Sequence, residues 1–166
     1  MARTLFEEVF ERAEVERARR ASSKNLITRD ECQAEISPMG VQRWYLHPRL
    51  DTPSTQALYF HELEIPVGSR SGKLFCQGGI VHLVLEGEGY TEVDGERHSW
   101  EAEDLIAIPI REYGVTYQHV NTGSTPVRMV VAWPNLDSAI GPEGGVEMKV
   151  LENAPEFEAL LTTSAS

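Results

Sequence analysis

Short runs of alternating apolar and polar residues dominate the middle of the chain. These runs cover residues 41–47, 57–65, 80–86, 89–94, 104–110, 115–120 and 127–133. Turn-forming sequences such as "PVG", "LEGEG" and "NTGSTP" separate them, and Asp94-Gly95 has the composition of a two-residue hairpin turn. Many short strands at close spacing are typical of an all-β sandwich or barrel.

The two ends of the chain have a different pattern. Apolar residues recur at helical spacing in residues 3–20, which predicts an amphipathic helix that packs on a core or on another subunit. Residues 21–40 are polar and irregular, and alternation stops after Trp133. We therefore expect an N-terminal helix and connecting arm (1–40), a β-barrel (41–135) and a C-terminal extension with a short ordered segment (136–166).

Composition and charge narrow the possible partners. The 166 residues suit one domain, and the formal net charge of -11 argues against nucleic acid or an anionic membrane as a partner. No apolar run approaches a membrane span, and the N-terminus has no apolar signal-peptide centre. The chain has only 2 cysteines, too few for a disulfide framework. These features predict a cytoplasmic protein.

Turn residues in two segments resemble the motifs of the cupin superfamily. In the first segment, Gly68 and Gly87 stand at the separation of the first cupin motif. In the second segment, Pro109, Gly114 and Asn121 fit the second motif. The phrases "CQGG", "LEGEGY" and "QHVNTG" are similar to single-domain cupins related to the gentisate-dioxygenase group. The resemblance implies a cupin double-stranded β-helix, which is a jelly-roll barrel.

The positions of the usual cupin metal ligands carry unusual residues. The resemblance places Leu74, Cys76, Ile80 and Tyr117 there. Leucine and isoleucine donate nothing to a metal, and one cysteine does not make a site. The sequence thus predicts that no cofactor is bound at the usual cupin site, and that Cys76 is a small, inert core residue.

Three histidines are candidates for a relocated metal site. Side chains two residues apart share a face of a strand, so His82 follows the inward Ile80 and His119 follows the inward Tyr117. His61 lies on the apolar face of its own strand. Together they could hold iron, zinc, nickel or copper. Hydrogen-bonded core histidines, or an acid–base pair acting on an organic substrate, are the alternatives.

The same alternation predicts the substrate pocket. We expect it to be lined by Leu74, Cys76, Ile80, His82, Tyr117 and His119, with His82, His119 and Tyr117 as the catalytic candidates. Tryptophans at positions 44, 100 and 133 are expected to fill the ends of the core, and a tryptophan that lines the mouth of the pocket is the alternative. His47 and His98 are expected to be surface or structural residues.

The sequence is compatible with two main functions. The first is a small-molecule-binding cupin with a degenerate metal site and an apolar pocket for an aromatic or carboxylated metabolite, with acid–base chemistry as one use of it. The alternative is a metal-dependent oxygenase, decarboxylase or isomerase that uses the relocated histidines. By analogy with cupins, we expect a homodimer, and a catalytically silent subunit is a third interpretation.

Overall fold

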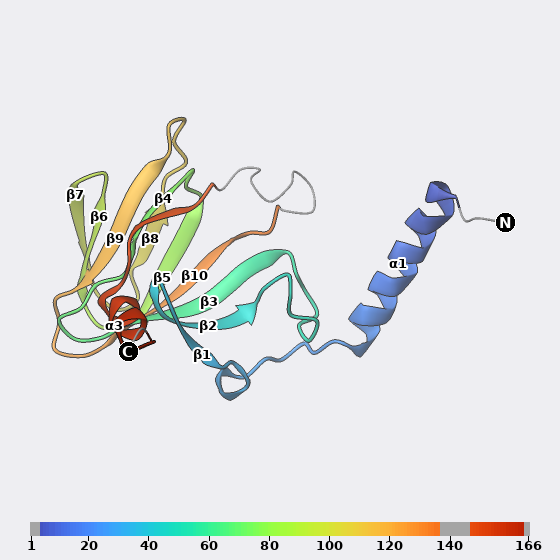
Figure 1. Cartoon of the computed structure of the whole chain (residues 1–166), viewed down its shortest axis with the longest axis horizontal. Helices are drawn as coiled ribbons and strands as arrows, with labels where there is room; N and C mark the ends of the chain where they lie inside the picture. Colours follow the sequence, from blue (N-terminus) through green and yellow to red (C-terminus); the bar gives the residue numbers. More distant parts are fainter. Residues whose placement is uncertain (1–3, 137–146, 165–166) are drawn as a thin grey trace.

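The fold consists of two antiparallel β-sheets packed face to face, flanked by a helix near each end of the chain (Figure 1). The computed structural model describes residues 4–136 and 147–164. Within them, six strands form the first sheet, in the order β1 (Ala34–Ser37), β2 (Gly40–Leu46), β3 (Leu58–Ile65), β10 (Val127–Pro134), β5 (Ile80–Glu86) and β8 (Leu105–Ile108). Five strands form the second, in the order β11 (Lys149–Glu152), β4 (Lys73–Cys76), β9 (Val115–Asn121), β6 (Gly89–Val93) and β7 (Glu96–Trp100).

Successive strands repeatedly change sheets, which is the connectivity of a jelly roll. The chain passes from β3 in the first sheet to β4 in the second, then back to β5, and it alternates again through β8, β9 and β10. Each strand therefore turns one of its two alternating faces toward the other sheet, and the buried core lies between the sheets. The predicted all-β jelly-roll fold with an N-terminal helix is confirmed.

Three strands lie where the sequence predicts no regular alternation. Strands β1, β4 and β11 have only four residues each, and in β1 and β11 most or all of those residues are exposed. An edge strand such as β1 or β11 does not need the strict alternation that a half-buried strand requires. Strand β4 lies between β11 and β9, and its four residues are too few for a period to show. The C-terminal segment expected from the sequence is helix α3 (Pro155–Ser164), which packs against β1 and β2.

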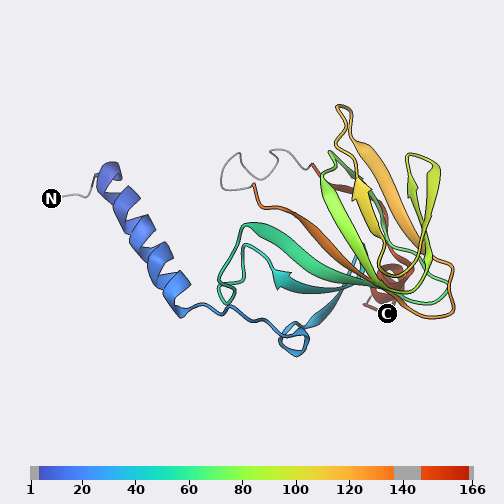
Figure 2. The same cartoon turned by 180° about the vertical axis from the view of Figure 1, so that it is seen from behind.

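Helix α1 (Leu5–Ser22) stands apart from the barrel in both views (Figures 1 and 2). It begins with a capping box, in which the Thr4 hydroxyl accepts from the Glu7 amide and the Glu7 carboxylate accepts from the Thr4 amide. None of its residues is buried in the single chain. No helix in the described part of the chain is long and apolar enough to cross a membrane.

A buried carboxylate on β3 is held by three arginines outside the core. The side chain of Glu62 is only 2% exposed, and its oxygens lie 3.0 Å from Arg29, 3.4 Å from Arg43 and 2.9 Å from Arg128. Burial acts to raise the pKa of Glu62, but the hydrogen bonds from Arg128 and Arg29 outweigh it, so the pKa lies below its usual value. The network ties the segment before β1 to strands β2, β3 and β10.

Candidate functional site

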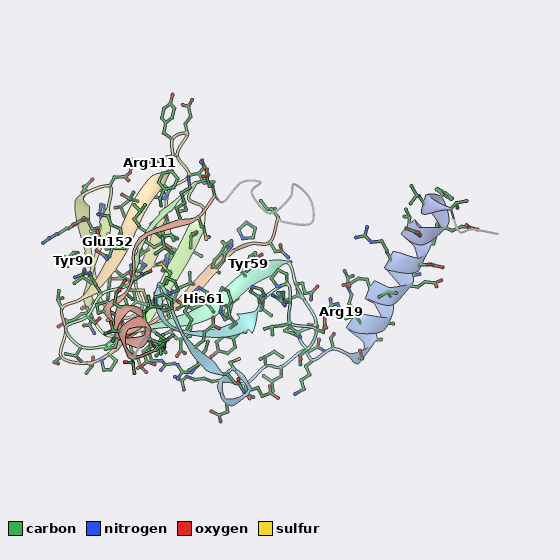
Figure 3. All side chains as sticks on the ribbon, in the orientation of Figure 1. Arg19, Tyr59, His61, Tyr90, Arg111 and Glu152 are labelled. Atoms are coloured by element: carbon green, nitrogen blue, oxygen red, sulfur yellow. The ribbon has the colours of Figure 1, made fainter. Side chains whose placement is uncertain are left out.

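A cavity of about 630 Å³ opens between the two sheets. Strands β2, β3, β5 and β10 of the first sheet and β4 and β9 of the second contribute to its wall, together with residues 37–39 and 147–150. The size is within the usual range for a site that binds a small organic molecule. Figure 3 shows two of its residues, Tyr59 and His61, on β3.

Part of the cavity wall is apolar. Leu63, Leu74, Ile80 and Val131 line it, and all four are buried in the core. Leu74 is paired in register with Tyr117 across β4 and β9, so the two side chains occupy the same face of the second sheet. These groups present hydrocarbon surface to any molecule that enters.

Aromatic rings form one wall of the cavity. Tyr59 stacks on Trp133 with ring centroids 4.8 Å apart and an angle of 11° between the ring planes. Trp44 meets the edge of Trp133 at 6.0 Å, and His47 meets Tyr59 at 5.3 Å. Offset stacking and edge-to-face contacts of this kind hold flat rings in fixed orientations.

The three tryptophans divide between the core and the cavity. Trp100 is buried in the core, and Trp133 packs against the core while it also lines the cavity. Trp44 lines the cavity as well. His47 also lines the cavity, and His98 is exposed on β7. Alternation along the strands could have predicted that Trp44 and Trp133 face the cavity. Trp44 lies two residues from the inward Gln42, and Trp133 lies two residues from the inward Val131.

His61 is a fully engaged core histidine. Its Nδ1 lies 3.2 Å from the Glu62 carbonyl oxygen, which assigns the proton to Nδ1, and the Gln42 amide can then donate to Nε2 at 3.3 Å. Trp44 covers the ring at a centroid distance of 4.4 Å. Burial lowers the pKa of His61 to about 4, so the ring is neutral at pH 7.

His82, Tyr117 and His119 form a compact group deeper in the barrel. The ring centroids of His82 and His119 are 4.4 Å apart, and Tyr117 lies 5.3 Å from each of them. Burial lowers the pKa of His119 to about 3. Burial also lowers the pKa of His82 well below its usual value, and the nearby His119 lowers it further. Burial likewise raises the pKa of Tyr117, so all three rings are neutral at pH 7.

The predicted pocket residues divide into two layers. Leu74, Ile80, His82 and Tyr117 line the cavity. Cys76 and His119 are fully buried but are not among the described residues that line it. His119 turns its Nδ1 to Thr91 at 2.7 Å, which holds its ring behind the cavity wall. Burial raises the pKa of the Cys76 thiol, which disfavours a reactive thiolate there.

The positions that the cupin resemblance assigns to metal ligands hold few donor atoms. Leu74 and Ile80 offer none, which leaves the Cys76 thiol and the Tyr117 hydroxyl. No three histidine, cysteine or acidic side chains in the described ranges gather closely enough to hold a metal ion. A site made by His61, His82 and His119 therefore stays a prediction.

Comparison with known proteins identifies the barrel. A family model described as a cupin domain matches residues 61–133. A search of curated proteins found no match. The cupin 2 conserved barrel domain protein from Salinispora arenicola is similar in structure, with a TM-score of 0.51 and 16% identity over 68% of this chain and 90% of that one.

Two solved enzymes also share the fold. The polyketide cyclase RemF from Streptomyces resistomycificus aligns with a TM-score of 0.55 and 19% identity, over 67% of this chain and 79% of that one. Salicylate 1,2-dioxygenase from Pseudoaminobacter salicylatoxidans, solved as adducts with gentisate, aligns with a TM-score of 0.55 and 17% identity. The alignment covers 72% of this chain but only 31% of the dioxygenase. The family model thus shows a cupin domain at residues 61–133, and the similar structures share its barrel fold.

Proposed function

We propose that the protein is a small-molecule-binding cupin whose cavity takes an aromatic metabolite. The observation that carries this proposal is the cavity of about 630 Å³ itself, whose wall includes buried hydrocarbon side chains and the stacked pair of Tyr59 and Trp133. A flat ring gains most from such a surface, because it buries apolar area and contacts aromatic faces together. Two enzymes with the same fold act on or bind aromatic compounds or polyketides by name, which is consistent with this ligand class.

The charges around the cavity favour a neutral ring over a carboxylate. Among the described lining residues, the only charged side chains are Glu147 and Lys149, which pair with each other at 2.8 Å. A carboxylate deep in the cavity would lose its water without gaining an unpaired cation. The cost of such burial is several kcal/mol.

A degenerate metal site at the usual cupin position is part of this proposal. Leucine and isoleucine at positions 74 and 80 widen the apolar surface where metal ligands would otherwise stand. Chemistry at the site would then come from His82 and Tyr117, which reach the cavity, with His119 behind them. Acid–base chemistry there would need a bound ligand to bring the pKa values of these two groups closer to the working pH, because proton transfer is most efficient when they match.

A pair of ring probes tests the proposal. We expect 1-naphthol to quench tryptophan fluorescence saturably at pH 7, and 1-naphthoate to bind at least about tenfold more weakly because its charge is unpaired. Trp133→Leu should weaken 1-naphthol binding by about tenfold or more, because it removes the aromatic wall. Tyr90→Leu is the matched control, since Tyr90 lies outside the cavity and packs under Arg97. Absence of saturable binding of either probe, or equal losses in both variants, would contradict the proposal.

A relocated metal centre is the second candidate function. It would make the protein a metal-dependent oxygenase, decarboxylase or isomerase. The observation in its favour is that His82 Nδ1 and His119 Nε2 are buried without hydrogen-bond partners. Metal analysis of protein purified without chelator separates the candidates. One equivalent of iron, zinc, nickel or copper that disappears in His82→Ala and His119→Ala would support the metal centre.

We also propose that the protein is a homodimer. The side chains of Leu5, Phe6, Val9 and Phe10 on α1 are each more than half exposed in the single chain. An apolar stripe of this size is typical of a contact with another chain. Light scattering should give twice the chain mass, and Phe6→Ser with Phe10→Ser should give the mass of one chain. An unchanged mass in that variant would place the contact elsewhere.

A further inference from the structure

A buried hydrogen-bond chain runs behind the cavity wall. Trp100 Nε1 donates to Thr91 Oγ1 at 2.8 Å, and Thr91 Oγ1 lies 2.7 Å from His119 Nδ1. Thr91 and His119 are wholly buried and paired in register on β6 and β9, and Trp100 is 5% exposed. Strand pairing therefore fixes the three groups relative to one another.

The donors and acceptors in this chain assign the proton on His119. An indole N–H can only donate, so Thr91 Oγ1 accepts from Trp100. The Thr91 hydroxyl keeps its own hydrogen to donate, and His119 Nδ1 is its remaining partner among the described residues. His119 Nδ1 is then an acceptor, and the single proton of the neutral ring stands on Nε2.

The next acceptor in line is His82. His119 Nε2 has no hydrogen-bond partner and is buried, and the same is true of His82 Nδ1. The two rings are neighbours, with centroids 4.4 Å apart. Leaving both nitrogens unpaired would cost about 1–3 kcal/mol each, and a small rotation of the rings that lets His119 donate to His82 removes both costs.

We propose that the chain from Trp100 through Thr91 and His119 fixes His82 with its proton on Nε2, so that the cavity meets its ligand with a neutral N–H donor. His82 lines the cavity while its Nδ1 is buried, which leaves the Nε2 side of the ring to face the ligand. His82 then acts toward the ligand as a hydrogen-bond donor, and not as a base. Thr91 and Trp100 are positioning residues in this arrangement.

This inference names the ligand chemistry more closely, and that part rests on the proposed aromatic ligand. A donor at His82 selects a ring that carries an acceptor oxygen, such as a carbonyl or a phenol. Donation to a carbonyl oxygen withdraws electron density from the carbonyl carbon and makes that carbon more reactive toward nucleophiles. A ring that offers only an N–H group at this place would leave two donors facing each other.

Histidine ¹⁵N spectra of the unliganded protein test the proton assignment. We expect His82 and His119 to show Nε2–H at pH 7, with assignments from the His82→Gln and His119→Gln spectra. Thr91→Val removes the fixed donor at nearly constant volume, so both rings should become mixtures of the two tautomers. Thr116→Val is the matched control, because this threonine of β9 bonds instead to Asp94 at the surface, and the spectrum should not change.

Two results would overturn the assignment. One is a proton on Nδ1 of His119 or His82 in the wild-type protein, which can be read whether or not any variant folds. The other is a Thr91→Val spectrum identical to that of the wild type. Trp100→Phe offers a further readout. It removes the N–H group that donates to Thr91 Oγ1, so His119 should also become a mixture of the two tautomers.

The carbonyl stretch of a bound ketone tests whether His82 donates to the ligand. The carbonyl stretch of bound 2-acetylnaphthalene should shift to lower wavenumber in the wild-type protein, and this shift should be lost in His82→Phe. A bound probe whose carbonyl stretch is the same in both proteins would contradict donation by His82. Failure of the probe to bind would count against the proposed aromatic ligand, whereas the ¹⁵N spectra would still decide the proton positions.

Discussion

Mild acid should destabilise this protein strongly, because its buried histidines are held neutral. The pKa of His61 is lowered to about 4 and that of His119 to about 3, against about 6.5 in an unfolded chain. Between these values the unfolded chain binds protons on both residues and the folded chain does not. The free energy of unfolding therefore rises with pH across this window. The part of it that depends on the two neutral histidines is lost progressively as the pH falls below about 6.5.

The size of the loss follows from the pKa differences. At pH 5, about 1.5 units below the usual histidine value, each of these residues costs about 2 kcal/mol, at 1.36 kcal/mol per unit. The two together remove about 4 kcal/mol, and the lowered pKa of His82 acts in the same direction. Carboxyl groups have usual pKa values near 4, so pH 5 leaves most of them ionised and isolates the histidine contribution. A loss of this size is a large part of the 5–15 kcal/mol that stabilises an ordinary domain.

Urea unfolding at pH 7 and pH 5 measures the effect. We expect the free energy of unfolding to fall by about 4 kcal/mol or more in the wild-type protein. In His61→Gln the fall should be about 2 kcal/mol smaller, because glutamine does not titrate. His98→Gln removes an exposed histidine instead and should show the wild-type fall. Equal stability of the wild-type protein at the two pH values would refute the view that these histidines are buried and neutral.

Two further substitutions test the frame of the barrel by urea unfolding at pH 7. Gly114→Ala should cost about 2–3 kcal/mol, because φ is +78° and the new Cβ would lie 2.3 Å from Phe75. Gly95→Ala, at φ +89° with nothing within 4 Å, should cost less, and equal losses would contradict the steric argument. Glu62→Gln should cost about 2 kcal/mol, because it removes the charge of a buried carboxylate from its arginine partners, whereas Glu86→Gln at the exposed end of the network should cost no more than about 0.5 kcal/mol. A loss in Glu86→Gln as large as that in Glu62→Gln would show that burial of the carboxylate is not what matters.

Alternation and turn chemistry were sufficient to predict an all-β sandwich or barrel, and the resemblance to cupins implied the jelly roll. Strands β9 and β10 alternate between buried and partly exposed residues because one face of each packs on the core. Strand β3 departs from this pattern, because Glu62 on its outer face is also buried. Strands β1, β4 and β11 escaped prediction because four-residue strands carry too few positions for a period to show. The sequence also could not predict that α1 stands apart from the barrel. An apolar stripe on a helix has the same pattern whether it packs on its own domain or on another chain.

The interior of the site was only partly predictable. The two-residue step along a strand correctly placed Ile80 with His82 and Tyr117 with His119 on inward faces, and all four are buried. The sequence did not show that His119 lies behind the cavity wall while His82 reaches the cavity. That difference depends on the Thr91 hydroxyl across the strand pair, and no spacing rule along a single strand contains it.

A crystal structure of the protein grown with 1-naphthol tests the central claim most directly. We predict the naphthalene ring in the cavity against Trp133, with its oxygen within hydrogen-bond distance of His82 Nε2 and no metal ion between them. A metal ion bonded by His61, His82 and His119, or a naphthol molecule bound only outside the cavity, would contradict the account.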